Sequence, residues 1–112
     1  MTLEHDIQKE VVTFLRQWYS NKLYVFAVPN AGMRSLTCYK YYEQEGLTPG
    51  VADLVICYKN AKTLFIEMKD KKGKQRPSQE LFEKEITKFG FKYFICRSLD
   101  DVLEVLKKEQ VI

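Results

Sequence analysis

Apolar residues near the start of the chain recur at the spacing of a helix with one buried face. They follow one another at steps of four, four, three and four residues. The members of this stripe are Leu3, Ile7, Val11, Phe14 and Trp18. The pattern therefore predicts an amphipathic helix over residues 3–18.

Four later segments are short and apolar and are bounded by turn residues, which is the pattern of buried strands. They span residues 23–28, 53–58, 63–69 and 91–97. The second and third segments are separated by only a short polar stretch, a spacing that suits an antiparallel hairpin. We therefore expect these two strands to pair directly.

The segment that begins at Pro77 predicts a further helix. Proline is favoured at the first helical position, and Gly90 lies just past the expected end. A last helix follows Ser98, which with Asp101 three residues later has the pattern of a helix cap. The apolar residues of the first of these helices that are expected to face inward are Leu81, Phe82, Ile86 and Phe89.

One segment, residues 33–45, settles into no single period and is compatible with a helix or with irregular structure. Its tyrosines Tyr39, Tyr41 and Tyr42 cannot all face one core. The alternation of the other helices and strands indicates the fold class α/β, with a mixed central sheet flanked by helices.

Length and composition limit the class of protein further. A chain of 112 residues with 46% hydrophobic and 29% charged residues is expected to form one globular domain over residues 1–112. The longest apolar runs fall short of the ~20 residues of a membrane span, and the N-terminal residues are polar, so we expect neither a membrane anchor nor a secretory signal. Three widely spaced cysteines and a single histidine indicate reduced thiols in a cytoplasm and exclude a Cys/His zinc site.

Positive charge is concentrated in one short stretch, residues 69–76. This stretch holds five basic residues and one acid, which gives it a net charge of +4. Since the whole chain has a net charge of +3, the remaining residues sum to −1. A basic loop on an otherwise balanced protein suits a contact with a polyanion such as nucleic acid. It also suits a solvated turn kept soluble by lysine, and charge alone leaves both interpretations open.

Two acids and a lysine stand at the ends of the predicted hairpin strands. Glu67 and Lys69 lie two residues apart, so their side chains point to the same face, and Asp53 at the start of the partner strand lies roughly across from them. Two carboxylates suit Mg²⁺, and the lysine could orient a nucleophile or stabilise charge in the transition state. An acid and a lysine at this spacing are also common in ordinary strands.

The ordered combination of these residues resembles a known nuclease core. Gly50, Val51, Ala52 and Asp53, followed fourteen residues later by Glu67, Met68 and Lys69, are similar to the PD-(D/E)xK motif. The whole chain is similar to the VRR-NUC family of that superfamily. Further matching features are Glu4, Gln8, residues 28–30, residues 46–53 and Gln79. Ala52 departs from the family pattern, which usually has proline there.

The resemblance implies a restriction-endonuclease-like fold and a role for each matching residue. Asp53 and Glu67 would bind Mg²⁺ or Mn²⁺ together with the Met68 backbone carbonyl, Lys69 would be the catalytic lysine, and Gln79 would align water, lysine or phosphate. Glu4 would reach a metal directly or through water, or would only carry a charge at the start of its helix. The residues expected to contact phosphate or to lie near the substrate are Asn30, Arg34, Lys71, Lys72, Lys74 and Arg76.

By the same resemblance, the chain would be a DNA endonuclease in the cytoplasm of a bacterial cell or a phage-infected host. Family members of this size resemble homodimeric nucleases that resolve branched DNA, such as four-way (Holliday) junctions. The alternative is a non-catalytic nucleic-acid-binding module with the same fold. A third interpretation, a plain α/β interaction protein, predicts no binding of divalent metal.

Overall fold

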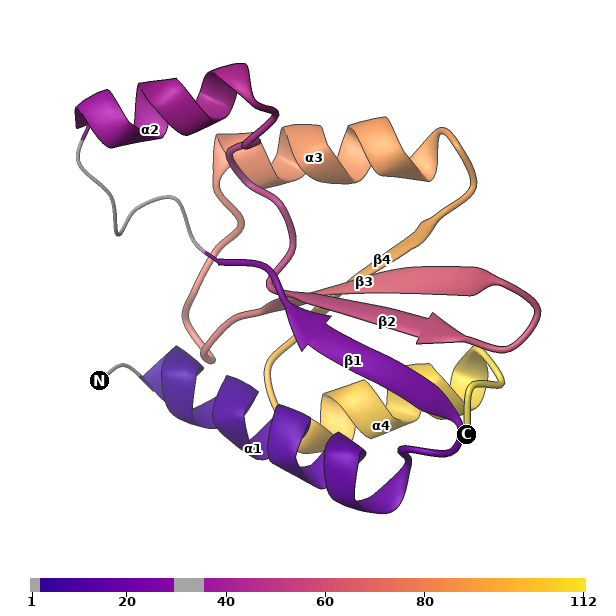
Figure 1. The fold of residues 1–112 in the computed structure, drawn as a ribbon. Coiled ribbons are helices and arrows are strands. Elements are labelled where there is room, and N and C mark those ends of the chain that lie inside the picture. The colour runs from indigo at the N-terminus through magenta and orange to yellow at the C-terminus, as the bar shows by residue number, and fades with distance from the viewer. Residues whose placement is uncertain (1–2, 30–35) are drawn as a thin grey trace.

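A four-stranded sheet forms the centre of the protein in the computed structural model, which describes residues 3–29 and 36–112 (Figure 1). Its strands are β1 (Leu23–Ala27), β2 (Leu54–Tyr58), β3 (Lys62–Met68) and β4 (Lys92–Cys96). They lie in the order β1-β2-β3-β4; the first three are antiparallel, and β4 is parallel to β3. The mixed sheet confirms the predicted α/β fold class and the predicted hairpin.

Helices cover both faces of this sheet. They are α1 (Leu3–Trp18), α2 (Leu36–Gln44), α3 (Pro77–Thr87) and α4 (Leu99–Lys108). The helices α1 and α4 lie on one face, whereas α3 lies on the other (Figure 1). Because parallel strands need a crossover connection, α3 is the element that lets β4 run alongside β3. None of the helices in the described ranges is long and apolar enough to cross a membrane.

The elements follow the sequence pattern closely. The helix predicted over residues 3–18 is α1, and the strands end within two residues of their predicted bounds. The segment that the pattern left open between helix and irregular structure contains α2. Ser98 caps α4 as predicted, since its Oγ accepts a hydrogen bond from the Asp101 N–H at 3.1 Å.

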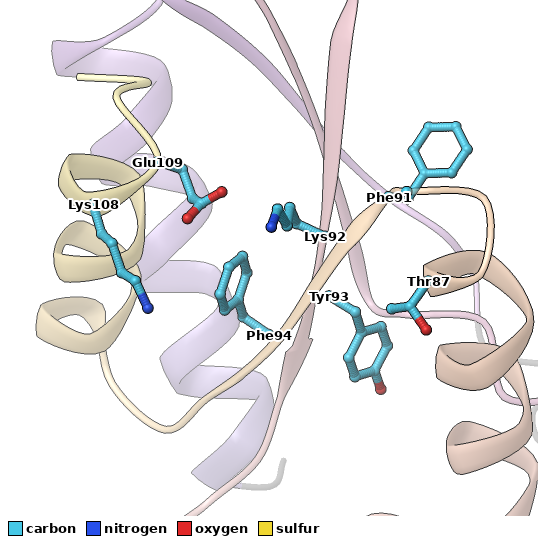
Figure 2. A pocket seen from close by; sticks show the side chains of 8 residues that line it. Thr87, Phe91, Lys92, Tyr93, Phe94, Lys108 and Glu109 are labelled. Carbon is cyan, nitrogen blue, oxygen red and sulfur yellow. The ribbon is translucent and has the colours of Figure 1, made fainter.

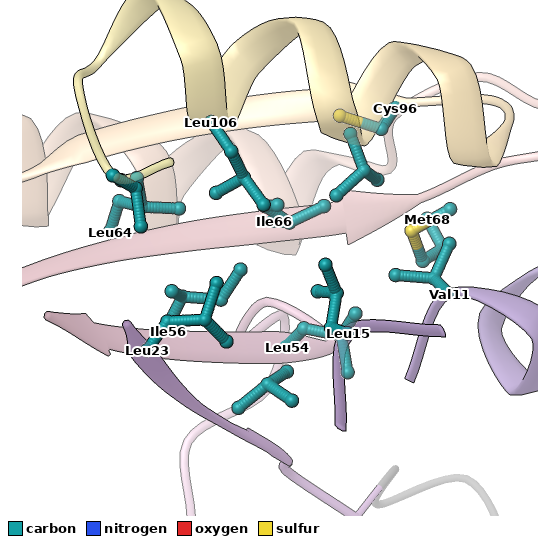
Figure 3. Packing of buried hydrophobic residues seen from close by; sticks show 13 residues of the cluster. Val11, Leu15, Leu23, Leu54, Ile56, Leu64, Ile66, Met68, Cys96 and Leu106 are labelled. Carbon is teal, nitrogen blue, oxygen red and sulfur yellow. The ribbon is translucent and has the colours of Figure 1, made fainter. Parts of the chain in front are cut away.

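The core lies between the sheet and the helices α1 and α4 (Figure 3). Val11 and Leu15 on α1, and Val102 and Leu106 on α4, are four residues apart and fully buried, so each pair presents one helix face. They pack against alternate strand residues that share one face of the sheet. The strand members of this core include Leu54, Ile56, Leu64, Ile66 and Met68.

A smaller aromatic cluster lies on the opposite face, under α3. The ring centroid of Phe65 lies 5.5 Å from that of Phe82 and 5.9 Å from that of Phe91, with the rings edge to face. Tyr93 is buried beside them, with its ring centroid 6.2 Å from that of Phe82. This cluster attaches α3 to β3 and β4.

The prediction that Leu81 and Phe89 face inward is wrong, since these residues are 58% and 75% exposed. Phe82 and Ile86, four residues apart, are the partly buried ones. Leu81 lies about 100° around the helix from Phe82, outside the strip that α3 presents to the sheet. Because α3 ends at Thr87, Phe89 lies in the turn beyond the helix.

A close backbone contact at Gly50 holds the loop that precedes β2 against the first turn of α3. Gly50 has a φ of +80°, and a Cβ atom there would lie 2.2 Å from the Ser78 carbonyl oxygen. Only glycine fits both the left-handed backbone and the missing space. The contact places the chain leading to Asp53 beside the helix turn that carries Gln79.

We therefore predict that Gly50→Ala destabilises the fold far more than Gly46→Ala. Both glycines have positive φ, but a Cβ at Gly46 would meet no atom within 4 Å. Gly46→Ala should cost about 1–2 kcal/mol from backbone strain alone. Gly50→Ala should cost at least about 2 kcal/mol more, because the loop must move off α3. Urea unfolding of both variants measures the difference, and equal costs would contradict the close contact.

Candidate active site

The predicted acids meet at one end of the sheet, where three elements start or finish. Asp53 directly precedes β2, Glu67 is the penultimate residue of β3, and Glu4 lies in the first turn of α1. In the β2–β3 register Leu54 pairs with Ile66, so Asp53 falls across from Glu67. The antiparallel hairpin therefore brings the two carboxylates together across fourteen residues of sequence.

The three carboxylates form a tight cluster. One oxygen from each of Glu4, Asp53 and Glu67 lies within 4.8 Å of the others. The Asp53 carboxylate is held in place by the backbone, because its Oδ2 accepts a hydrogen bond from the Met68 N–H at 2.8 Å. This bond joins the start of β2 to the end of β3 and sets the position of the cluster.

Glu67 is the most unusual member of the cluster because it is only 1% exposed. Its Oε2 accepts a hydrogen bond from the Gln79 amide at 2.9 Å and lies 3.8 Å from the Lys69 Nζ. Its Oε1 is also buried but accepts no hydrogen bond from any described residue. A buried carboxylate oxygen without a partner costs free energy, so this atom indicates room for a cation or a donor.

Burial and like charge disfavour ionisation in the cluster. Burial, followed by the neighbouring Asp53 carboxylate, raises the pKa of Glu67 to about 9, and the Lys69 ammonium only partly opposes this. Burial also raises the pKa of Glu4, against the opposing effect of Lys69. A divalent cation would relieve both penalties, and all-oxygen ligands are the set that Mg²⁺ and Mn²⁺ accept. The residues present therefore fit such an ion.

Lys69 and Gln79 are held beside Glu67 by backbone contacts. Lys69 is 3% exposed, and its N–H donates to the Cys96 carbonyl at 3.0 Å, which extends the β3–β4 ladder by one residue. The Gln79 side chain makes two hydrogen bonds: its Nε2 donates to the Glu67 carboxylate, and its Oε1 accepts from the Arg76 N–H at 2.8 Å. These two bonds fix the orientation of the amide, so Gln79 positions the carboxylate rather than merely lying near it.

The basic loop begins directly after Lys69 and is shaped by Arg97. The Arg97 Nη1 donates to the carbonyl oxygens of Asp70 and Gly73, at 2.6 and 2.8 Å. The Asp70 carboxylate accepts from the backbone N–H groups of Lys72 and Gly73. The predicted phosphate contacts in this loop are all exposed: Lys71, Lys72, Lys74 and Arg76. The predicted contacts Asn30 and Arg34 lie outside the described residues.

A hollow that the sequence pattern did not predict adjoins the acids. It has a volume of about 360 Å³ and lies between α1 and the segment that follows β1. Gln8 and Lys9 line it together with Glu4 and Asp53. The helical spacing of four between Glu4 and Gln8 is the signal that could have placed Gln8 at this edge.

Comparison with known proteins decides the family. The model of the VRR-NUC domain matches residues 8–100, which is most of the chain. The chain belongs to the VRR-NUC family. It is therefore a nuclease-type domain, and the match includes Asp53, Glu67, Lys69 and Gln79, whereas Glu4 precedes it.

Solved structures of VRR-NUC domains share the fold. One, named as a VRR-NUC domain protein, has a TM-score of 0.74 and 21% sequence identity, over 96% of this chain and 88% of that one. Another, named as a VRR-NUC domain, has a TM-score of 0.67 and 20% identity, over 96% of this chain and 97% of that one. No curated protein sequence matches the chain.

The raised pKa of Glu67 predicts a pH-dependent loss of stability in metal-free protein. Because the folded pKa of about 9 exceeds the unfolded value of 4.5, the folded state holds an extra proton between these values. The free energy of unfolding should therefore fall as pH rises from 5 to 8, by at most about 1.4 kcal/mol per pH unit.

Urea unfolding in EDTA, measured for the wild type and for Glu67→Gln, tests this slope. The variant should lose it, so that Glu67→Gln becomes more stable than the wild type at pH 8. Glu10→Gln, at an exposed position on α1, is the control and should keep the wild-type slope. The burial argument fails if Glu67→Gln and the wild type keep the same pH dependence.

Proposed function

We propose that this VRR-NUC domain is a divalent-metal-dependent endonuclease that hydrolyses DNA phosphodiester bonds. The observation that carries the proposal is the buried Oε1 of Glu67, which lacks a partner among the described residues, on a carboxylate that clusters with those of Asp53 and Glu4. A fold stabilised only by its own contacts gains nothing from three carboxylates so close together. A bound cation explains why they converge.

Each residue of the site has a role in this proposal. Asp53, Glu67 and the Met68 carbonyl would hold Mg²⁺ or Mn²⁺, with Glu4 as a further ligand, directly or through water. When bound, such an ion lowers the pKa of water and offsets charge on a phosphodiester. Lys69 would donate hydrogen bonds to the attacking water or to the phosphate, and Gln79 would keep Glu67 aligned.

The alternative is a nucleic-acid-binding module that binds DNA but does not hydrolyse it. Such a module needs the basic loop but not the acidic cluster, and its acid or lysine positions would be free to change. Here Asp53, Glu67 and Lys69 are all in place and within reach of one another. The arrangement therefore favours the enzyme.

DNA is the proposed partner because the basic loop continues directly from the site. Lys69 ends buried beside Glu67, and the exposed lysines follow within a few residues. Cations placed this close to the acids can hold the backbone on either side of a scissile phosphate. Arg97 keeps the loop in this position through its two carbonyl contacts.

Branched DNA and a symmetric homodimer complete the proposal. Within residues 3–29 and 36–112, one chain carries one acidic cluster of this kind. Resolving a four-way junction needs two nicks on opposing strands, which a two-fold dimer would supply. The surface proposed for the interface is α2, where most side chains are exposed and Tyr41 and Tyr42 expose 61% and 37%. Exposed aromatic residues are enriched at protein interfaces.

Loss of the metal ligand should abolish cleavage without unfolding the protein. Asp53→Asn keeps an acceptor for the Met68 N–H but removes a charge, so we expect the cleavage rate to fall more than about 100-fold. Lys69→Ala should lose rate while Mn²⁺ affinity is retained, because the lysine acts on the substrate and not on the ion.

Linear, flap, splayed and four-way DNA, incubated with and without Mg²⁺ or Mn²⁺, measures these rates. Lys22→Ala, at an exposed position in the turn between α1 and β1, is the control for Lys69. Full cleavage by Asp53→Asn would refute the assigned metal site. A wild type that binds these DNAs but cleaves none would instead support the binding module.

Charge removal in the basic loop should weaken DNA binding in a salt-dependent way. Replacing Lys71, Lys72 and Lys74 together by Gln should flatten the dependence of log K on log salt by up to about 0.9 for each phosphate that these lysines neutralise. Fluorescence anisotropy at several salt concentrations measures the slope. An unchanged slope would make the loop a solvated turn.

The dimer should be visible by light scattering at micromolar concentration. We expect a mass of two chains, and a mass of one chain after Tyr41→Ser and Tyr42→Ser are combined. The mass of a single chain in the wild type, alone and with junction DNA, would exclude the dimer. A dimer that survives both substitutions would place the interface elsewhere and leave the tyrosines covering their own chain.

A further inference from the structure

The end of the sheet remote from the acids carries two adjoining hollows. The first, of about 320 Å³, lies between the β2–β3 turn and the turn that follows α3. The second, of about 360 Å³, wraps around β4, an edge strand, toward α4 (Figure 2). Both are bordered by Gly90, Phe91, Lys92 and Glu109. The first hollow lies at the end of β3 opposite the acidic cluster, about 20 Å away, which is the length of the strand. The second extends from there along β4 as far as Phe94, which pairs with Ile66.

Two phenylalanine rings at these hollows are unusually open to solvent. Phe89 is 75% exposed and Phe91 is 43% exposed. The Phe91 ring meets that of Phe65 edge to face and points outward, so it is held in place while much of its surface stays free (Figure 2). The Lys88 Nζ lies 5.6 Å from the centroid of the Phe89 ring. The packing of Phe91 against Phe65 suits it to stacking, because little conformational entropy remains to be lost, and Phe89 offers a largely open ring beside it.

The hollows are also positively charged. Lys62 and Lys92 line the first, and Lys92 and Lys108 line the second, against the single carboxylate of Glu109. Figure 2 shows Lys92, Lys108 and Glu109 gathered around the ring of Phe94. Open aromatic rings among lysines are the combination that binds single-stranded nucleic acid. The shared positive charge opposes a second copy of this chain docking through the same surface.

We propose that the two hollows bind an unpaired strand of nucleic acid, with bases stacked on Phe89 and Phe91 and phosphates held by Lys62, Lys92 and Lys108. The inference deepens the proposed function, on which it rests: the strand would be an unpaired arm of a DNA whose junction lies at the acids. Every base has a face that can stack, so the contact would tolerate any sequence.

Binding of a fluorescein-labelled dT oligonucleotide of about twelve nucleotides tests this site. The assay uses fluorescence anisotropy in EDTA, so that it is independent of the metal centre. Phe89→Ser should weaken binding at least about fivefold, because stacking contributes on the order of 1 kcal/mol or more per base. Leu81→Ser, which removes a 58% exposed apolar residue from α3, should leave the affinity unchanged.

A second pair of variants separates stacking and charge from loss of fold. Phe91→Leu keeps an apolar partner for Phe65 but removes the ring, so it should weaken binding while the free energy of unfolding changes little. Lys92→Gln should flatten the salt dependence by about 0.7 if Lys92 neutralises one phosphate of a single strand. Lys22→Gln, at an exposed position that lines neither hollow, should leave the salt dependence unchanged.

Wild-type affinity for the oligonucleotide in both Phe89→Ser and Phe91→Leu would overturn the proposal. The proposal would also be overturned if these two variants changed the oligomeric mass in light scattering but kept the wild-type affinity for the oligonucleotide. The surface would then contact protein. This binding test can fail or succeed independently of the nuclease assay. Loss of oligonucleotide binding in the phenylalanine variants supports the site even if the wild type cleaves no DNA. If the variants bind as the wild type does, the proposed site is wrong even when the wild type cleaves DNA.

Discussion

The carboxylate of Glu67 is buried at the end of β3, and the surrounding elements are arranged to tolerate it. Gln79 donates to it from the first turn of α3, and this turn can approach only because Gly50 leaves room for the Ser78 carbonyl. Lys69 contributes a buried ammonium from the residue that follows the same strand. These contacts satisfy one carboxylate oxygen and leave the other buried without a partner among the described residues. The fold therefore accepts a cost in stability that a bound cation would offset.

Much of the fold follows from local pattern. The helix α1 and the hairpin of β2 and β3 could be predicted because each presents one face to a core, which imposes a period of 3.6 or 2 on its apolar residues. The helix α2 exposes most of its side chains, so no such period is imposed on it. The prediction for Phe89 failed because its apolar character fits the period of α3, whereas the helix ends before reaching it.

The candidate site was partly predictable for the same reason. Asp53, Glu67 and Lys69 belong to one hairpin, so the register alone brings them together. The burial of Glu67 and its unpartnered oxygen depend on α1 and α3, which pack from distant parts of the chain. Arg97 likewise reaches the basic loop across more than twenty residues. Contacts of this kind depend on the tertiary arrangement and leave no spacing in the sequence.

The central claim is that the carboxylates of Glu67 and its neighbours form a cation site. Titration of the protein with Mn²⁺, followed by electron paramagnetic resonance of the free ion, tests it without any DNA. We expect the wild type to remove Mn²⁺ from solution and Glu67→Gln to do so at least about tenfold more weakly. Glu10→Gln should behave as the wild type does. Equal Mn²⁺ binding by wild type and Glu67→Gln would contradict the account.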